Sequence, residues 1–162
     1  MQSEAIINLI AHYDAVEDRI RLDCELHTEE MLRLYMTQRF SKNIVAQLVK
    51  IIEASDCNHT RHSLSQHFAV QSKIAASNSL VGQEVETHLI QKLHFQNVQA
   101  GYRILLEVNE ERGVHLQGDL DFLRNILDIF HKSFLRAQWP TQAFPSWIVP
   151  PEIDYATQNS LN

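Results

Sequence analysis

The chain has 162 residues, 44% of them hydrophobic, so it is long enough to bury a core and short enough to favour one compact unit. Its 20 acidic and 14 basic side chains give a formal net charge of −6, which argues against general nucleic-acid binding and against an anionic membrane surface. The apolar runs are too short to span a membrane, and the N-terminus lacks a secretory pattern. The chain has only two cysteines, Cys24 and Cys57. Together these features predict a cytoplasmic protein in a reducing compartment.

The first third of the chain predicts three strands and a helix. Residues 5–13 form an apolar run, and residues 19–26 and 31–36 then alternate apolar with polar side chains, which is typical of strands half buried in a sheet. The short polar link at 27–30 predicts a hairpin between the second and third strands. Thr37 can accept a hydrogen bond from the first helical turn, and the apolar residues that follow at spacings of four predict a helix to about Ala54.

Residues 55–86 are rich in Ser, Asn, Gln and His, and they predict a polar connector that contains a loosely packed helix. This connector holds Cys57, His59, His62 and His67, which are residue types that bind zinc. On a helix His67 would stand about 140° from His62, so a tetrahedral site would require an irregular loop. A solvated connector is the favoured alternative, and no cofactor is expected.

The second half of the chain repeats the pattern of the first. Strands are predicted at about 88–96, 102–108 and 113–118, and Asp119 is positioned to cap a helix that runs to about Ala137. All four prolines and both tryptophans then fall within residues 139–151, where proline forbids regular structure. The large apolar side chains of this tail either wrap over the domain or dock on a partner; they are Trp139, Phe144, Trp147 and Ile148.

The two halves align without a gap at an offset of 82 residues. Over residues 7–52 apolar positions fall on apolar positions, and identical residues recur at positions 12, 16, 21, 25, 29, 34, 40, 43, 44 and 50. We therefore predict an α+β fold made of a duplicated strand-strand-strand-helix unit with pseudo-twofold symmetry. The preferred arrangement is one six-stranded antiparallel sheet with both helices on one face. Residues 1–138 would form one domain, with repeats at 1–54 and 87–138 around the connector at 55–86, and residues 139–162 would form the tail.

Two sets of repeated polar residues are candidate site residues. His12 and His94 occupy equivalent positions and share the sheet face away from the helices with His115, where they would bind a ligand or act as ordinary polar residues. Asn43 and Lys50 recur as Asn125 and Lys132 on the helix flank away from the core, where packing does not require them. They would contact a partner, or the lysines would simply favour the negative ends of the helices.

No nucleophile motif, P-loop or dinucleotide-binding motif occurs, and glycine is found only four times. The favoured hypothesis is a non-enzymatic protein-interaction module that binds a protein partner or itself, as an adaptor, an assembly subunit or a substrate-holding chaperone. The alternative is a small-ligand or metal-dependent enzyme that uses the histidines named above. A third hypothesis is a local nucleic-acid contact through Arg33, Arg39 and Lys42.

Overall fold

The computed structural model describes residues 2–55, 59–71 and 84–149, and it has a mixed α+β architecture with three α-helices. Its elements are β1 (Gln2–Asp14), β2 (Arg19–Leu26), β3 (Met31–Met36), α1 (Gln38–Ala54), α2 (His59–Gln71), β4 (Glu86–Leu89), β5 (Lys92–Val98), β6 (Gly101–Glu107), β7 (Arg112–Gly118), α3 (Leu120–Ala137) and the 3-10 helix η1 (Ser146–Ile148).

The strands form one seven-stranded sheet in the order β4-β3-β2-β1-β7-β6-β5. The prediction of a purely antiparallel sheet is wrong, because β1 pairs with β7 and β3 pairs with β4 in parallel. The other neighbours are antiparallel, including β2 and β3, which form the predicted hairpin. Alternation within a strand shows which face is buried, but it does not reveal the direction of the neighbouring strand.

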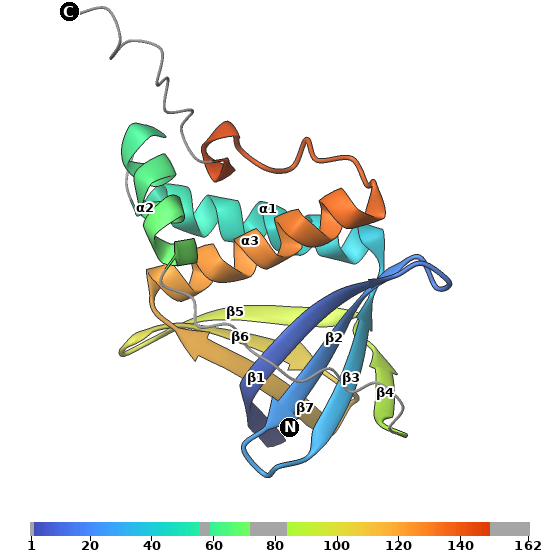
Figure 1. Ribbon diagram of the computed structural model, residues 1–162. Helices are drawn as coiled ribbons and strands as arrows, with labels where there is room; N and C mark the ends of the chain where they lie inside the picture. Colours follow the sequence, from blue (N-terminus) through green and yellow to red (C-terminus); the bar gives the residue numbers. More distant parts are fainter. Residues whose placement is uncertain (1, 56–58, 72–83, 150–162) are drawn as a thin grey trace, which may run out of the picture.

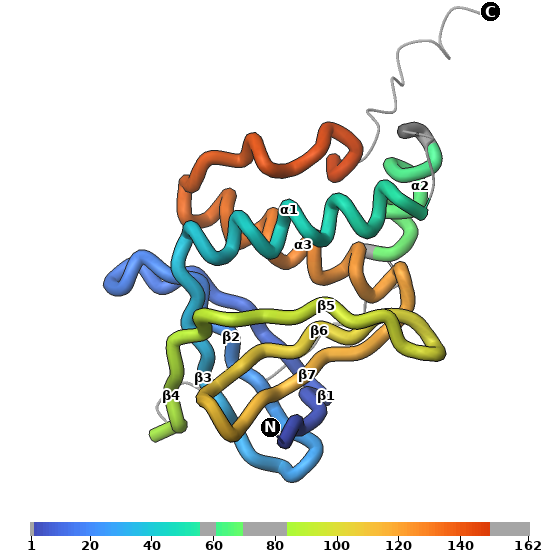
Figure 2. The backbone as a smooth tube through the Cα atoms, turned by 180° about the vertical axis from the view of Figure 1, so that it is seen from behind, coloured from blue at the N-terminus to red at the C-terminus, as the bar shows by residue number. Residues whose placement is uncertain are grey.

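The sheet is strongly curled, because the strands at its two edges follow each other directly in the chain. β4 ends at Leu89 and β5 begins at Lys92, so only two residues connect one edge with the other. Figures 1 and 2 show the strands curling round beneath the helices. A single strand was predicted at 88–96, and the break between β4 and β5 is why seven strands are found where six were expected.

β1 divides its pairing between the two halves of the sheet. Residues 2–5 lie parallel to residues 112–115 of β7, and from Ile6 onward β1 pairs antiparallel with β2. The β1–β2 register shifts between Ile6 and Asn8, so Ile7 is the extra residue of a β-bulge. Beyond Ala5 the edge of β1 that faced β7 has no partner strand among the described residues.

The two long helices lie together over one side of the curled sheet (Figure 1). Both begin where predicted, since the side chains of Thr37 and Asp119 accept hydrogen bonds from the backbone N–H groups of Phe40 and Phe122. Their ends at Ala54 and Ala137 also agree with the prediction. The predicted connector helix is α2, which packs against α3 and η1.

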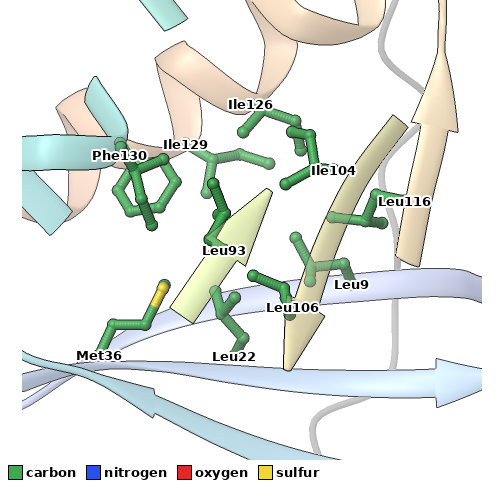
Figure 3. A pocket seen from close by; sticks show the side chains of 11 residues that line it. Leu9, Leu22, Met36, Leu93, Ile104, Leu106, Leu116, Ile126, Ile129 and Phe130 are labelled. Atoms are coloured by element: carbon green, nitrogen blue, oxygen red, sulfur yellow. The ribbon is translucent and has the colours of Figure 1, made fainter. Parts of the chain in front are cut away.

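The core lies between the curled sheet and the helices, and it draws its apolar side chains from both halves of the chain. Figure 3 shows side chains of β2, β5, β6, β7 and α3 converging with Met36 on one small cavity. The cavity has a volume of about 20 Å³ and an entirely apolar lining. Such a space is the size of one water molecule and offers it no hydrogen bond, so it is a packing gap in the core.

Candidate functional site: two grooves between helix and strand edge

Two open grooves lie where the long helices meet strand edges. Groove A lies between α3 and β1 and has a volume of about 310 Å³. Its lining residues are Ile6, Ile7, Asn8, Leu9, Leu116, Gln117, Phe122, Asn125, Ile126 and Ile129. Groove B lies between α1 and β5, has a volume of about 230 Å³ and is lined by Phe40, Asn43, Ile44, Gln47, Gln91, Lys92, Leu93 and His94.

Groove A exists because β1 and β7 diverge. Their last parallel pair is Ala5 with His115, and the groove begins at the next residue of each strand. Figure 1 shows the two strands separating as they approach the helices. The edges of both strands therefore line the groove, and α3 forms its remaining wall.

The lining of groove A is neutral and mainly apolar. No charged residue is among its lining residues, and the β1 sequence from Ala5 to Ala11 also contains none. Ile7 is 59% exposed at the β-bulge. The side-chain oxygen of Asn125 is buried and has no hydrogen-bond partner among the described residues. Groove A thus combines apolar contact area, an unpaired strand edge and an acceptor that lacks a donor.

The repeated asparagines fall in different grooves. Asn43 is exposed and lines groove B, whereas Asn125 is half buried and lines groove A. The repeated lysines line neither groove. Lys50 is exposed, and the ammonium group of Lys132 lies 2.8 Å from the Asp128 carboxylate one helical turn away.

The aromatic tail packs on the chain's own helix layer. Trp139 is 7% exposed, contacts Tyr13 and Phe134 edge to face, and donates its indole N–H to Asp18 at 2.9 Å. Trp147 is 2% exposed and donates to Glu53 at 3.0 Å. Phe144 is half buried against His131 and Phe134, and Ile148 is buried in the core. In this arrangement both indoles are engaged within the chain.

The three histidines predicted on the outer sheet face do not form one cluster. His94 and His115 both pair with Leu105 on β6, so one strand separates their backbones by about 10 Å, and each ring contacts a different partner. His94 contacts the Glu107 carboxylate at 2.6 Å, and His115 contacts the Ser3 hydroxyl at 2.6 Å. Burial lowers the pKa of His115 below its usual value.

His12 belongs to a polar cluster around Asp23 that the sequence did not predict. The Asp23 carboxylate has 1% of its side chain exposed and accepts a hydrogen bond from Arg33 Nε at 2.8 Å. Arg21 lies 3.3 Å from the other carboxylate oxygen, and His12 Nε2 lies 3.8 Å from it. Burial, followed by the neighbouring Arg21, lowers the pKa of His12. Strand alternation places these residues on one face, but only the register of β1, β2 and β3 brings them together.

The connector cluster is only partly within the described residues. Cys57 lies outside them, and His59 is the first residue of α2. His62 is buried, stacks on Trp147 and accepts a hydrogen bond at Nδ1 from Arg124 at 3.0 Å. His67 contacts the ring of Phe68. Within residues 2–55, 59–71 and 84–149, no group of three or more His, Cys, Asp or Glu side chains is arranged to hold a metal ion.

The hypothesis of a nucleic-acid contact named three basic residues, which lie in different surroundings. Arg33 pairs with Asp23, whereas Arg39 and Lys42 lie on α1.

No helix in the described ranges combines the length and apolarity needed to cross a membrane. No protein-family model matches the chain, and no significant match was found among curated proteins or solved structures.

Proposed function

We propose that this chain is a non-enzymatic protein-interaction module that holds an extended segment of a partner polypeptide in groove A. The observation that carries the proposal is the uncharged edge of β1, which has no partner strand beyond Ala5 among the described residues and faces an apolar wall of α3. An extended segment would add to this edge through main-chain hydrogen bonds and place alternate side chains against Phe122 and Ile129.

The size of groove A favours weak, reversible binding. Each buried apolar side chain contributes about 1.5–3 kcal/mol, and each hydrogen bond contributes a net of about 0.5–1.5 kcal/mol, against the cost of ordering the segment. A groove of about 310 Å³ accepts only a few side chains, so the interface is small. Main-chain hydrogen bonds and a neutral apolar wall do not select particular side chains, so segments of many sequences would fit groove A. This tolerance supports a substrate-holding role more than the role of a dedicated adaptor.

The rival enzyme hypothesis has less support. His94 and His115 stand apart on β5 and β7, and the atom that His12 presents to Asp23, Nε2, is buried. General acid–base catalysis requires a group within hydrogen-bonding reach of the substrate. Groove A supplies a volume with open access, whereas the Asp23 cluster lines none of the grooves described above.

We also infer that the chain is an internal duplication with a pseudo-twofold axis. Equivalent pairs support this: Glu4 pairs with Val114, and 82 residues later Glu86 pairs with Leu32. The β2–β3 and β6–β7 pairings share one register at the same offset. In the proposed symmetry, β1 with its bulge corresponds to β4 and β5 together, and grooves A and B are equivalent positions.

One ion pair supports a position for the proposed axis. Glu30 and Arg112 are equivalent residues at the offset of 82, and their side chains lie 2.8 Å apart. Equivalent residues in contact are expected beside a twofold axis. Arg112 also pairs with Glu4 and Glu86, which are equivalent to each other, at 3.0 and 3.1 Å.

The proposal is tested with peptides of about ten residues that alternate apolar with neutral polar side chains. Fluorescence anisotropy on the full chain should find binders, and Ile7→Lys should weaken their affinity by about tenfold, because it places a charge on the strand edge. Ile7 is 59% exposed, so the variant should fold. Val16→Lys is the matched control, because Val16 is 94% exposed at a hairpin tip away from groove A, and it should leave binding unchanged.

Main-chain recognition is tested separately by N-methylating alternate peptide bonds of the best binder. Strand addition predicts that one of the two methylated series loses binding while the other keeps it, since only alternate N–H groups face the receptor strand. The proposal is contradicted if no peptide in the set binds, if Ile7→Lys and Val16→Lys behave alike, or if both methylated series bind as well as the parent peptide.

A further inference from the structure

Groove B differs from groove A in its charge. Lys92 lines it with 72% of its side chain exposed, and Arg39 and Lys50 lie exposed on α1. Neither Arg39 nor Lys50 has a salt bridge among the described residues. This exposed basic flank occurs on a chain with a formal net charge of −6, so it is a local departure from the overall charge.

Helical geometry places the two α1 cations on the side of α1 that faces groove B. Asn43 lines the groove, and Lys50, seven residues later, lies within about 20° of it around the helix axis. Arg39, four residues before Asn43, lies within about 40°. Lys42 is one residue before Asn43 and therefore stands about 100° away, on another side of the helix.

Glu110 lines a neighbouring hollow together with Lys92, and the acidic residue that pairs with Lys92 at this rim is Glu107 on β6. Its carboxylate lies 3.3 Å from Lys92 and 2.6 Å from His94, so it is already engaged. These contacts lower the pKa of Glu107, with the hydrogen bond from His94 as the largest cause. Lys92 is paired with Glu107, so Arg39 and Lys50 carry the excess positive charge near groove B.

The lining of groove B mixes apolar side chains with three side-chain amides. Phe40, Ile44 and Leu93 contribute to the lining, and β5 pairs with β6 on one edge only among the described residues. Lys92 at this open edge would discourage unselective strand pairing. Cations and amide N–H groups beside apolar side chains are complementary to an acidic segment that carries an apolar side chain.

We propose that groove B is a second binding site that selects extended acidic polypeptide segments with an apolar residue next to the carboxylates. This inference rests on the proposed function, because it extends strand capture to a second edge. The chain would then hold one polypeptide at two places, with a neutral apolar stretch in groove A and an acidic stretch in groove B. Two linked contacts would raise the overall affinity without a new interface.

The test compares a peptide of about ten residues containing Asp, Glu and Leu with its Asn and Gln analogue on the full-length chain. Titration should show tighter binding of the acidic peptide, with an affinity that falls as salt is added. Lys50→Glu and Arg39→Glu should each weaken the acidic peptide by about threefold to tenfold. Lys42→Glu is the matched control, because it makes the same charge change on another side of α1 and should have a clearly smaller effect.

The outcomes separate the two proposals. If the neutral peptide binds and responds to Ile7→Lys but the acidic peptide does not bind better than its amide analogue, groove B is overturned and the proposed function stands. If Lys42→Glu weakens the acidic peptide as much as Lys50→Glu, the effect is long-range charge and the site is also overturned. If a single-stranded oligonucleotide binds more tightly than the acidic peptide, the occupant of groove B is a nucleic acid and the proposal is contradicted. If neither peptide binds, both proposals fail.

Discussion

Asp23 shows how a charged side chain becomes buried on the outer face of a sheet. Its neighbours in the β1–β2–β3 register cover it, and its side chain is only 1% exposed. Arg33 satisfies one carboxylate oxygen, while the other has Arg21 at 3.3 Å and His12 at 3.8 Å without a hydrogen bond. Removing Asp23 would leave the partly buried Arg21 and Arg33 uncompensated, so the cluster favours one fixed arrangement of these strands.

Stability should fall as the pH is lowered through about 6.5. Burial is the first cause that lowers the pKa values of His12, His115 and His131 in the folded chain. The unfolded chain therefore binds more protons in this range, so acidification favours unfolding. Urea unfolding on either side of this pH should show a lower midpoint in acid. His131→Gln should reduce the difference between the two midpoints, and a midpoint that rises in acid would contradict the assignment.

The helices are the elements that the sequence predicted best. Both start at a capping side chain, both end where the apolar stripe ends, and both bury that stripe against the sheet. These properties depend on residues within one or two turns of each other, so they can be inferred locally. Gln138, which adopts a left-handed conformation at the end of α3, is a detail that only the structure provides.

Removing the cap of α3 should destabilise the protein measurably. Asp119→Ala deletes the acceptor for the Phe122 backbone N–H and should cost about 1 kcal/mol in the free energy of unfolding. Asp121→Ala is a suitable control, because Asp121 lies in the first turn, where its carboxylate interacts favourably with the helix dipole, and this interaction is worth less than the cap. Urea denaturation monitored by circular dichroism measures both. Equal losses in the two variants would show that the cap is not the cause.

The strands were predicted with the correct buried face but with incomplete pairing. Local alternation does not reveal that β1 leaves β7 after Ala5, or that Ile90 and Gln91 separate β4 from β5. Groove A follows from the divergence of β1 and β7 and groove B from the open edge of β5, so neither groove could be predicted. The sequence did single out Asn43 and Asn125, because repeated polar residues away from the core require an explanation.

At the scale of the whole molecule, the aromatic tail completes the helix layer. Trp139 connects it to the β1–β2 hairpin through Asp18, and Trp147 connects it to α1 through Glu53. The guanidinium of Arg124 lies 5.6 Å from the Trp147 ring, and His62 of α2 stacks on the same ring. Four segments that are distant in sequence, α1, α2, α3 and η1, therefore meet at the Trp147 indole.

Trp147→Ala should cost about 3–5 kcal/mol in the free energy of unfolding, because it leaves a cavity among α1, α2 and α3 and removes the contacts with Glu53, Arg124 and His62. The side chain is 2% exposed. Leu135→Ala is the control, since Leu135 is 56% exposed and should change stability by less than about 0.5 kcal/mol. Circular dichroism avoids reliance on the deleted fluorophore. An unchanged stability of Trp147→Ala would mean that the tail does not stabilise the domain.

The sequence by itself determined the helices, their caps, the buried faces of the strands and the general composition of the core. These features depend on periodicity and on neighbours a few residues apart. Only the tertiary structure decided the parallel pairs, the curling of the sheet, the Asp23 cluster and the two grooves. Each of these joins residues far apart in the chain, as in the contact of Arg112 with Glu4. Such contacts form when packing and strand register select one partner among many, and no local pattern specifies that choice.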